Sequence, residues 1–107
     1  MSDIQEQLQK IINENKLVLF MKGTPTHPAC GFSLRAISLL KACGVKESDL
    51  IAINVLDDDS IRQGVKDFSH WPTIPQLYID STFVGGSDIM SELFESGELR
   101  KMIQSIQ

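Results

Sequence analysis

Apolar residues near the N-terminus recur at the spacing of three and four that marks one face of a helix. They are Ile4, Leu8, Ile11 and Ile12. Ser2 and Gln5 stand in the capping-box arrangement that begins many helices, so we predict a helix over about residues 3–14. Residues 16–21 then read KLVLFM, a short run with almost no polar side chains. Such a run is typical of a central strand that is buried on both faces.

The segment after this strand has the composition of a loop and leads to a cysteine. Residues 22–29 read KGTPTHPA, and the glycine and the two prolines disfavour regular structure. A helical pattern then begins at Gly31, and Gly44 suits its C-terminal cap. One face of this helix comprises Ser33, Ala36, Ile37, Leu40 and Cys43. We therefore expect Cys30 at a helix N-terminus.

The second half of the chain predicts a strand, three helices and a hairpin. Residues 50–55 indicate a strand and residues 57–69 a helix, whose first three residues, 57–59, are aspartates that complement the helix dipole. QLYI and TFV, separated by Asp80 and Ser81, predict an antiparallel hairpin. After Gly85 and Gly86, we expect Ser87 or Asp88 to cap a helix that runs through Phe94, and Gly97 to separate it from a last helix ending near residue 106.

This order of elements predicts an α/β protein with a small mixed sheet of four strands flanked by helices, and the thioredoxin fold is its simplest match. The length of 107 residues fits one domain over residues 1–107.

Composition and charge exclude several classes of function. The net charge of −4 and the pI near 5.0 disfavour a nucleic-acid partner, which calls for a basic face. No apolar run approaches the roughly 20 residues of a membrane span, and the first ten residues lack the features of a signal peptide. We therefore expect a cytoplasmic protein that binds neither nucleic acid nor membrane.

The two cysteines differ in their surroundings. A thiolate attacks disulfides and binds metals, and a helix N-terminus lowers the pKa of a thiol, so Cys30 is the candidate reactive residue rather than a packed one. Cys43 continues an apolar helix face and is expected to be buried. Ser33 occupies the place where a second cysteine would allow an internal disulfide. Cys43 lies about 20 Å farther along the helix, beyond the roughly 7 Å that a disulfide tolerates between Cα atoms.

Four sequence motifs together resemble those of one known family. The CGFS motif at residues 30–33 is preceded by MKGTPTHPA and followed by WPTIPQLYI and VGGSD. In order and spacing these motifs are similar to those of the monothiol, CGFS-type glutaredoxins, in particular the single-domain bacterial type, and the similarity covers almost the whole chain.

The resemblance implies a glutathione site around Cys30. The positions that match the family's glutathione contacts are Lys22, Phe32, Arg62, Thr73, Ile74, Pro75, Gly86, Ser87 and Asp88. Lys22 and Arg62 match positions that reach the glycyl carboxylate, although solvated side chains are the alternative for both. Ile74 would offer its backbone beside a cis-proline, the alternative being an ordinary trans turn.

The last three of these positions would bind the γ-glutamyl end of glutathione. Backbone N–H groups from Gly86 and Ser87 would reach its carboxylate and Asp88 its ammonium group, or the segment is simply a strand end and a helix start. The chain departs from many relatives by having Ile74 in place of an aromatic residue and Ser87 in place of a cysteine.

One chain offers a single suitable thiolate for a [2Fe-2S] cluster, which normally has four ligands. The resemblance implies that Cys30 of two protomers and two glutathione thiols complete the set, so that the protein is a homodimer with the cluster and a monomer without it. Its function would be cluster transfer to apo iron–sulfur acceptor proteins. Two alternatives stay open: a glutathione-dependent oxidoreductase, for which the family tends to weak activity, and a regulatory adaptor for BolA-like partners.

Overall fold

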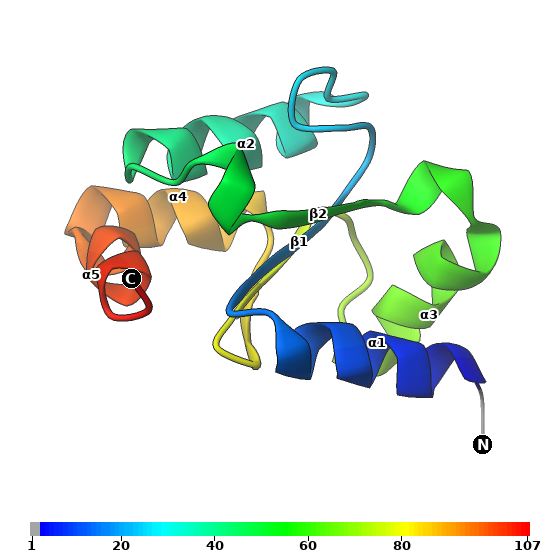
Figure 1. The fold of residues 1–107 in the computed structure, drawn as a ribbon. Helices are drawn as coiled ribbons and strands as arrows, with labels where there is room; N and C mark the ends of the chain where they lie inside the picture. The colour runs from blue at the N-terminus through cyan, green and yellow to red at the C-terminus, as the bar shows by residue number, and fades with distance from the viewer. Residues whose placement is uncertain (1–2) are drawn as a thin grey trace.

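The computed structural model describes residues 3–107, and in it a four-stranded sheet lies between two layers of helices (Figure 1). The strands, in the order β2-β1-β3-β4 across the sheet, are β1 (Leu17–Met21), β2 (Ile51–Asn54), β3 (Gln76–Ile79) and β4 (Thr82–Gly85). The α-helices are α1 (Asp3–Glu14), α2 (Gly31–Ala42), α3 (Asp59–Ser69), α4 (Ser87–Ser96) and α5 (Glu98–Gln104). Two short 3-10 helices, η1 (Glu47–Asp49) and η2 (Val55–Asp57), flank β2.

The sheet is mixed, as the sequence predicts. β1 pairs with β2 in parallel and with β3 antiparallel, and β3 pairs with β4 antiparallel. Asp80 and Ser81 connect the β3–β4 hairpin with positive φ angles of 50° and 66°, as in a type I′ turn. The predicted architecture is therefore confirmed.

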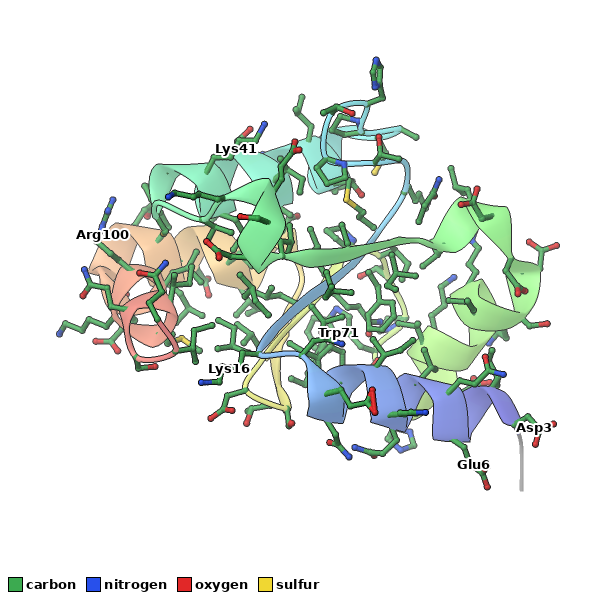
Figure 2. The ribbon with its side chains drawn as sticks, in the orientation of Figure 1. Asp3, Glu6, Lys16, Lys41, Trp71 and Arg100 are labelled. Carbon is green, nitrogen blue, oxygen red and sulfur yellow. The ribbon has the colours of Figure 1, made fainter. Side chains whose placement is uncertain are left out.

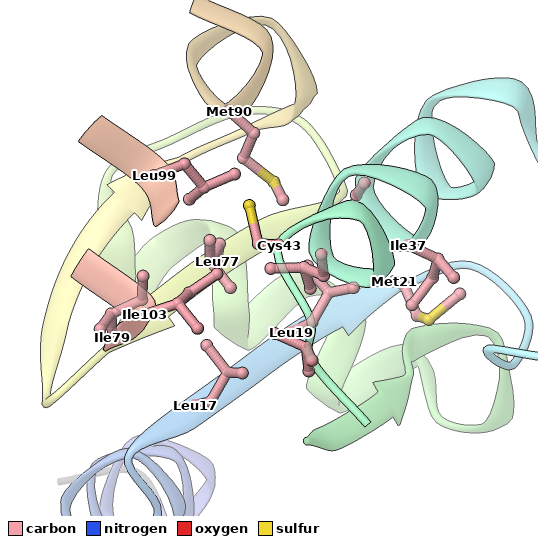
Figure 3. Close-up of a cluster of buried hydrophobic side chains, with 13 residues drawn as sticks. Leu17, Leu19, Met21, Ile37, Cys43, Leu77, Ile79, Met90, Leu99 and Ile103 are labelled. Atoms are coloured by element: carbon pink, nitrogen blue, oxygen red, sulfur yellow. The ribbon is translucent and has the colours of Figure 1, made fainter. Parts of the chain in front are cut away.

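The central strand β1 supplies both halves of the core. All five of its residues are buried, and successive side chains of a strand point to opposite faces. Leu17, Leu19 and Met21 join the cluster under α2, α4 and α5 (Figure 3). Val18 and Phe20 join the cluster under α1 and α3. The two helix layers are thus held to one strand, which ends where the cysteine loop begins.

Several predicted element ends were wrong by one or two residues. β1 begins at Leu17 rather than at residue 16, β2 spans Ile51–Asn54 rather than 50–55, and β4 extends to Gly85. The helices α4 and α5 end at Ser96 and Gln104. The predicted capping box includes Ser2, which lies outside the described residues.

The starts of α3 and α4 differ from the prediction for physical reasons. α3 begins at Asp59 rather than at residue 57, because Asp58 is its N-cap and accepts a hydrogen bond of 2.8 Å from the Ser60 N–H. α4 has Gly86 as its N-cap and no side-chain cap, so the predicted capping by Ser87 or Asp88 is wrong. Both of these residues already belong to the first turn of the helix.

No helix among residues 3–107 combines the length and the apolar character needed to cross a membrane.

Candidate functional site

The sulfur of Cys30 lies at the first turn of α2. Cys30 is the N-cap residue, and its Sγ accepts a hydrogen bond from the Ser33 N–H at 3.4 Å. The Ser33 Oγ also lies 3.4 Å from the sulfur. The predicted placement of the cysteine at a helix N-terminus is confirmed.

Ser33 connects the cysteine to the end of β1. Its side chain is completely buried, and its Oγ accepts a hydrogen bond of 3.0 Å from the Lys22 N–H. Because the Lys22 N–H occupies Oγ as an acceptor, the hydroxyl proton of Ser33 is available to the Cys30 sulfur. The serine of the CGFS motif is therefore placed to donate to a thiolate.

These contacts determine the protonation of Cys30. Burial alone raises the pKa of the thiol, but hydrogen bonds from the Ser33 hydroxyl and from the Ser33 and Phe32 N–H groups, together with the charge of Lys22, lower it further than burial raises it. The net effect lowers the Cys30 pKa below its ordinary value. A thiolate at this position can act as nucleophile or as metal ligand.

The loop before Cys30 is held by backbone contacts. The Ala29 N–H donates to the Lys22 carbonyl at 2.9 Å, and the Gly23 N–H donates to the Asn54 Oδ1 at 3.0 Å. Gly23 has φ +87°, and a Cβ there would collide with the His27 carbonyl oxygen. Only glycine fits this position without moving the loop.

A cavity of about 390 Å³ lies beside this loop. Eight of the predicted glutathione residues line it: Lys22, Phe32, Thr73, Ile74, Pro75, Gly86, Ser87 and Asp88. Cys30 does not line the cavity. Phe32 and Lys22 do, and the Lys22 N–H donates to Ser33 in the first turn of α2. The structure therefore gathers residues from four separate segments at one place, whereas their contacts with glutathione stay a prediction.

Two predicted residues have a different setting from the one expected. Arg62 does not line the cavity; Lys66, one turn later on α3, does. Asp88 is highly exposed and its Oδ1 lies 3.5 Å from a guanidinium nitrogen of Arg35. Lys66 was not among the predicted residues, although its position four residues after Arg62 places both on one helix face.

The segment from Trp71 to Pro75 forms another wall of the cavity. The Ile74–Pro75 peptide bond is cis, as predicted. The Trp71 ring, which is labelled in Figure 2, packs against Phe83 of β4 with ring centroids 5.6 Å apart. A Cβ on Gly86 would lie 3.2 Å from the Pro75 carbonyl oxygen, so glycine allows this segment and the start of α4 to approach closely.

The second cysteine is remote from this chemistry. Cys43 is 6% exposed and lies in the cluster that contains Met90 and Leu77 (Figure 3). Burial raises the pKa of the Cys43 thiol, with a smaller opposing effect from Arg100. Its predicted burial is confirmed.

Within residues 3–107, no group of three or more histidine, cysteine, aspartate or glutamate side chains is placed to hold a metal ion.

Known proteins resemble this chain in sequence and in structure. The family described as Glutaredoxin matches residues 17–84. The mitochondrial monothiol glutaredoxin-5 of Schizosaccharomyces pombe is 52% identical over 102 residues, which cover 95% of this chain and 70% of that protein. The probable monothiol glutaredoxin 2 of Rickettsia prowazekii is 52% identical over 101 residues, which cover 94% and 92%.

The fold is also found in a solved relative. A monomeric truncated mutant of Trypanosoma brucei 1-C-Grx1 superimposes with a TM-score of 0.82 at 38% identity, covering 98% of this chain and 93% of that one. With its single thiol in the first turn of α2 and a serine three residues later, this chain belongs to the glutaredoxin family, among the monothiol glutaredoxins.

Proposed function

We propose that the chain binds glutathione in the cavity beside Cys30 and, as a homodimer, holds a [2Fe-2S] cluster that it passes to apo iron–sulfur proteins. The observation that carries this proposal is a lone cysteine with a lowered pKa, next to a cavity, with a serine in place of the second cysteine. Residues 1–107 act as one glutaredoxin domain in this proposal.

The cavity has the charges that glutathione requires. The tripeptide carries two carboxylates and one ammonium group, and the cavity wall contains the cations Lys22 and Lys66 and the carboxylate of Asp88. Its volume of about 390 Å³ lies in the usual range for small-ligand sites, roughly 300–1,000 Å³. Lys22 and Lys66 pair with the glycyl carboxylate. Arg62 does not line the cavity, and its predicted contact with the same carboxylate stays untested.

The other end of glutathione is assigned to the start of α4. The N–H groups of Gly86 and Ser87 meet the γ-glutamyl carboxylate at a helix N-terminus, and Asp88 pairs with the ammonium group. Thr73, Ile74 and Pro75 contact the middle of the tripeptide, and the exposed ring of Phe32 covers it from α2.

The cluster is cargo that this chain cannot bind alone. A [2Fe-2S] cluster takes four ligands, usually thiolates, and Cys43 is buried. Two Cys30 thiolates and two glutathione thiols make four. Phe32 and Leu34 in the first turn of α2 are 57% and 53% exposed and provide an apolar surface for the second chain.

The lowered Cys30 pKa also supports a second function, the reduction of glutathione mixed disulfides. The Cys30 thiolate would attack the glutathionyl sulfur and release the substrate thiolate, and a second glutathione thiolate would then restore Cys30 and form oxidised glutathione. A BolA-like partner could replace one protomer in the cluster complex. A cytoplasmic location stays a prediction, since relatives such as the Schizosaccharomyces pombe protein are described as mitochondrial.

Anaerobic reconstitution with iron, sulfide and glutathione tests the proposal. The native chain should give a coloured species, and Cys30→Ala should stay colourless. Cys43→Ala is the matched control, because it removes the buried thiol and should keep the colour. Fast turnover of a glutathione mixed disulfide with no coloured species would instead establish the oxidoreductase.

A further inference from the structure

Gln76 is a buried polar residue that the proposed chemistry leaves without a role. It is the first residue of β3 and is completely buried. Its Nε2 donates two hydrogen bonds to the preceding segment, to the Trp71 carbonyl at 3.1 Å and to the Thr73 carbonyl at 3.0 Å. The opposite amide orientation would set Oε1 against two carbonyl oxygens, so these bonds determine which atom is the nitrogen.

The two bonds span a segment that has few other attachments. Its first end is tied to α3, because the Trp71 N–H donates to the Lys66 carbonyl at 3.3 Å and to the Ser69 Oγ at 3.1 Å. Pro72 and Thr73 are exposed and gain little from packing. The side chain of Ile74 is 6% exposed and anchors the other end. Between these two ends, the amide of Gln76 is the contact that holds the backbone.

Holding the Thr73 carbonyl also aims the next N–H group. A trans peptide unit is planar, and its C=O and N–H point in opposite directions. The Thr73 carbonyl points to Gln76, so the Ile74 N–H points away from Gln76. Thr73 and Ile74 both line the cavity, whereas Gln76 does not. Among residues 3–107, no acceptor receives a hydrogen bond from this N–H.

We propose that Gln76 is a positioning residue, which fixes the Thr73–Ile74 peptide plane so that the Ile74 N–H donates to the backbone of the bound tripeptide. This inference rests on the proposed binding of glutathione. Glutathione then meets a donor that is already oriented, and binding does not have to order the segment. Gln76 acts through the segment and does not itself touch the ligand, since it lies outside the cavity wall.

Gln76→Met tests this role, because methionine has a similar length and cannot donate to the two carbonyls. Titration calorimetry of the variant with reduced glutathione should give a dissociation constant about tenfold higher than that of the native chain. This is the loss expected for one neutral hydrogen bond between the Ile74 N–H and the ligand. The pH profile of Cys30 alkylation should not change, because its contacts come from Ser33, Phe32 and Lys22.

The control is Ile103→Ala, a buried position in the cluster on the other face of the sheet. It should lower the melting temperature and leave the dissociation constant unchanged. If Gln76→Met also lowers only the melting temperature, Gln76 is a structural residue and the inference is overturned.

A second measurement needs no variant and applies even if Gln76→Met does not fold. In the ¹⁵N-labelled native chain, the amide signal of Ile74 should shift on addition of reduced glutathione and exchange more slowly with solvent. An unshifted Ile74 signal during saturable binding would overturn the inference while leaving the proposed function in place. A native chain that binds no glutathione would overturn the proposed function itself.

Discussion

Replacing Ser33 with alanine should change both the pKa of Cys30 and the stability of the fold, and two assays measure these effects separately. The change removes the hydroxyl 3.4 Å from the sulfur and leaves the Lys22 N–H without its acceptor at 3.0 Å. We therefore expect the Cys30 pKa to rise, because one of the groups that lower it is gone.

The cost in stability follows from the lost backbone partner. Leaving a buried donor unpaired costs about 1–3 kcal/mol. For a protein of this size, a loss of 1 kcal/mol lowers the melting temperature by roughly 4–8 °C. Ser33→Ala should therefore melt several degrees below the native chain, since the lost bond between Lys22 and Ser33 is part-buried.

The assay is the rate of alkylation of Cys30 by iodoacetamide across pH, measured on the Cys30 peptide by mass spectrometry so that Cys43 does not contribute. The profile of Ser33→Ala should move to higher pH. Ser96→Ala is the control, because it removes an exposed hydroxyl that donates to the Leu93 carbonyl at 3.0 Å. Superimposable profiles for Ser33→Ala and the native chain would refute the assigned role of the serine.

Three further predictions test other parts of the structure. Burial raises the Tyr78 pKa to about 12 from 10.0, with a smaller lowering effect from the Ser69 hydroxyl. The unfolded chain thus ionises first, stability is lost as pH rises from 10 to about 12, by on the order of 2 kcal/mol, and Tyr78→Phe should abolish this loss in urea unfolding at alkaline pH. A loss that persists in the variant would contradict this. Gly23→Ala should lower both the melting temperature and glutathione affinity, since its Cβ collides with backbone; unchanged calorimetric values would show that the loop can shift freely. Lys66→Gln should weaken glutathione binding two- to fivefold, as expected of a partly exposed ion pair, whereas equal affinity would remove Lys66 from the site.

Most of the fold could be predicted from local patterns in the sequence. The run LVLFM predicted a strand buried on both faces, and a loop with two prolines before a helical pattern predicted Cys30 at a helix start. These features depend on residues that are neighbours in sequence, which is why periodicity and turn composition identify them. The α4 cap was mispredicted because Gly86 contributes no side chain, whereas the backbone of β4 already directs the chain into the helix.

Features that join distant segments were not predictable. The ion pair of Arg35 with Asp88 connects α2 to α4, and the hydrogen bond of Gly23 to Asn54 connects the cysteine loop to β2. Lys66 rather than Arg62 lines the cavity, and this depends on how α3 is rotated against the sheet. No spacing in the sequence determines these contacts, because each depends on tertiary packing.

Native mass spectrometry of the anaerobically reconstituted protein counts the ligands of the proposed cluster. We expect a coloured species whose mass equals two chains, one [2Fe-2S] cluster and two glutathione molecules, and which dissociates into colourless single chains when glutathione is removed. A cluster-loaded single chain whose mass includes no glutathione would refute the proposed ligand set.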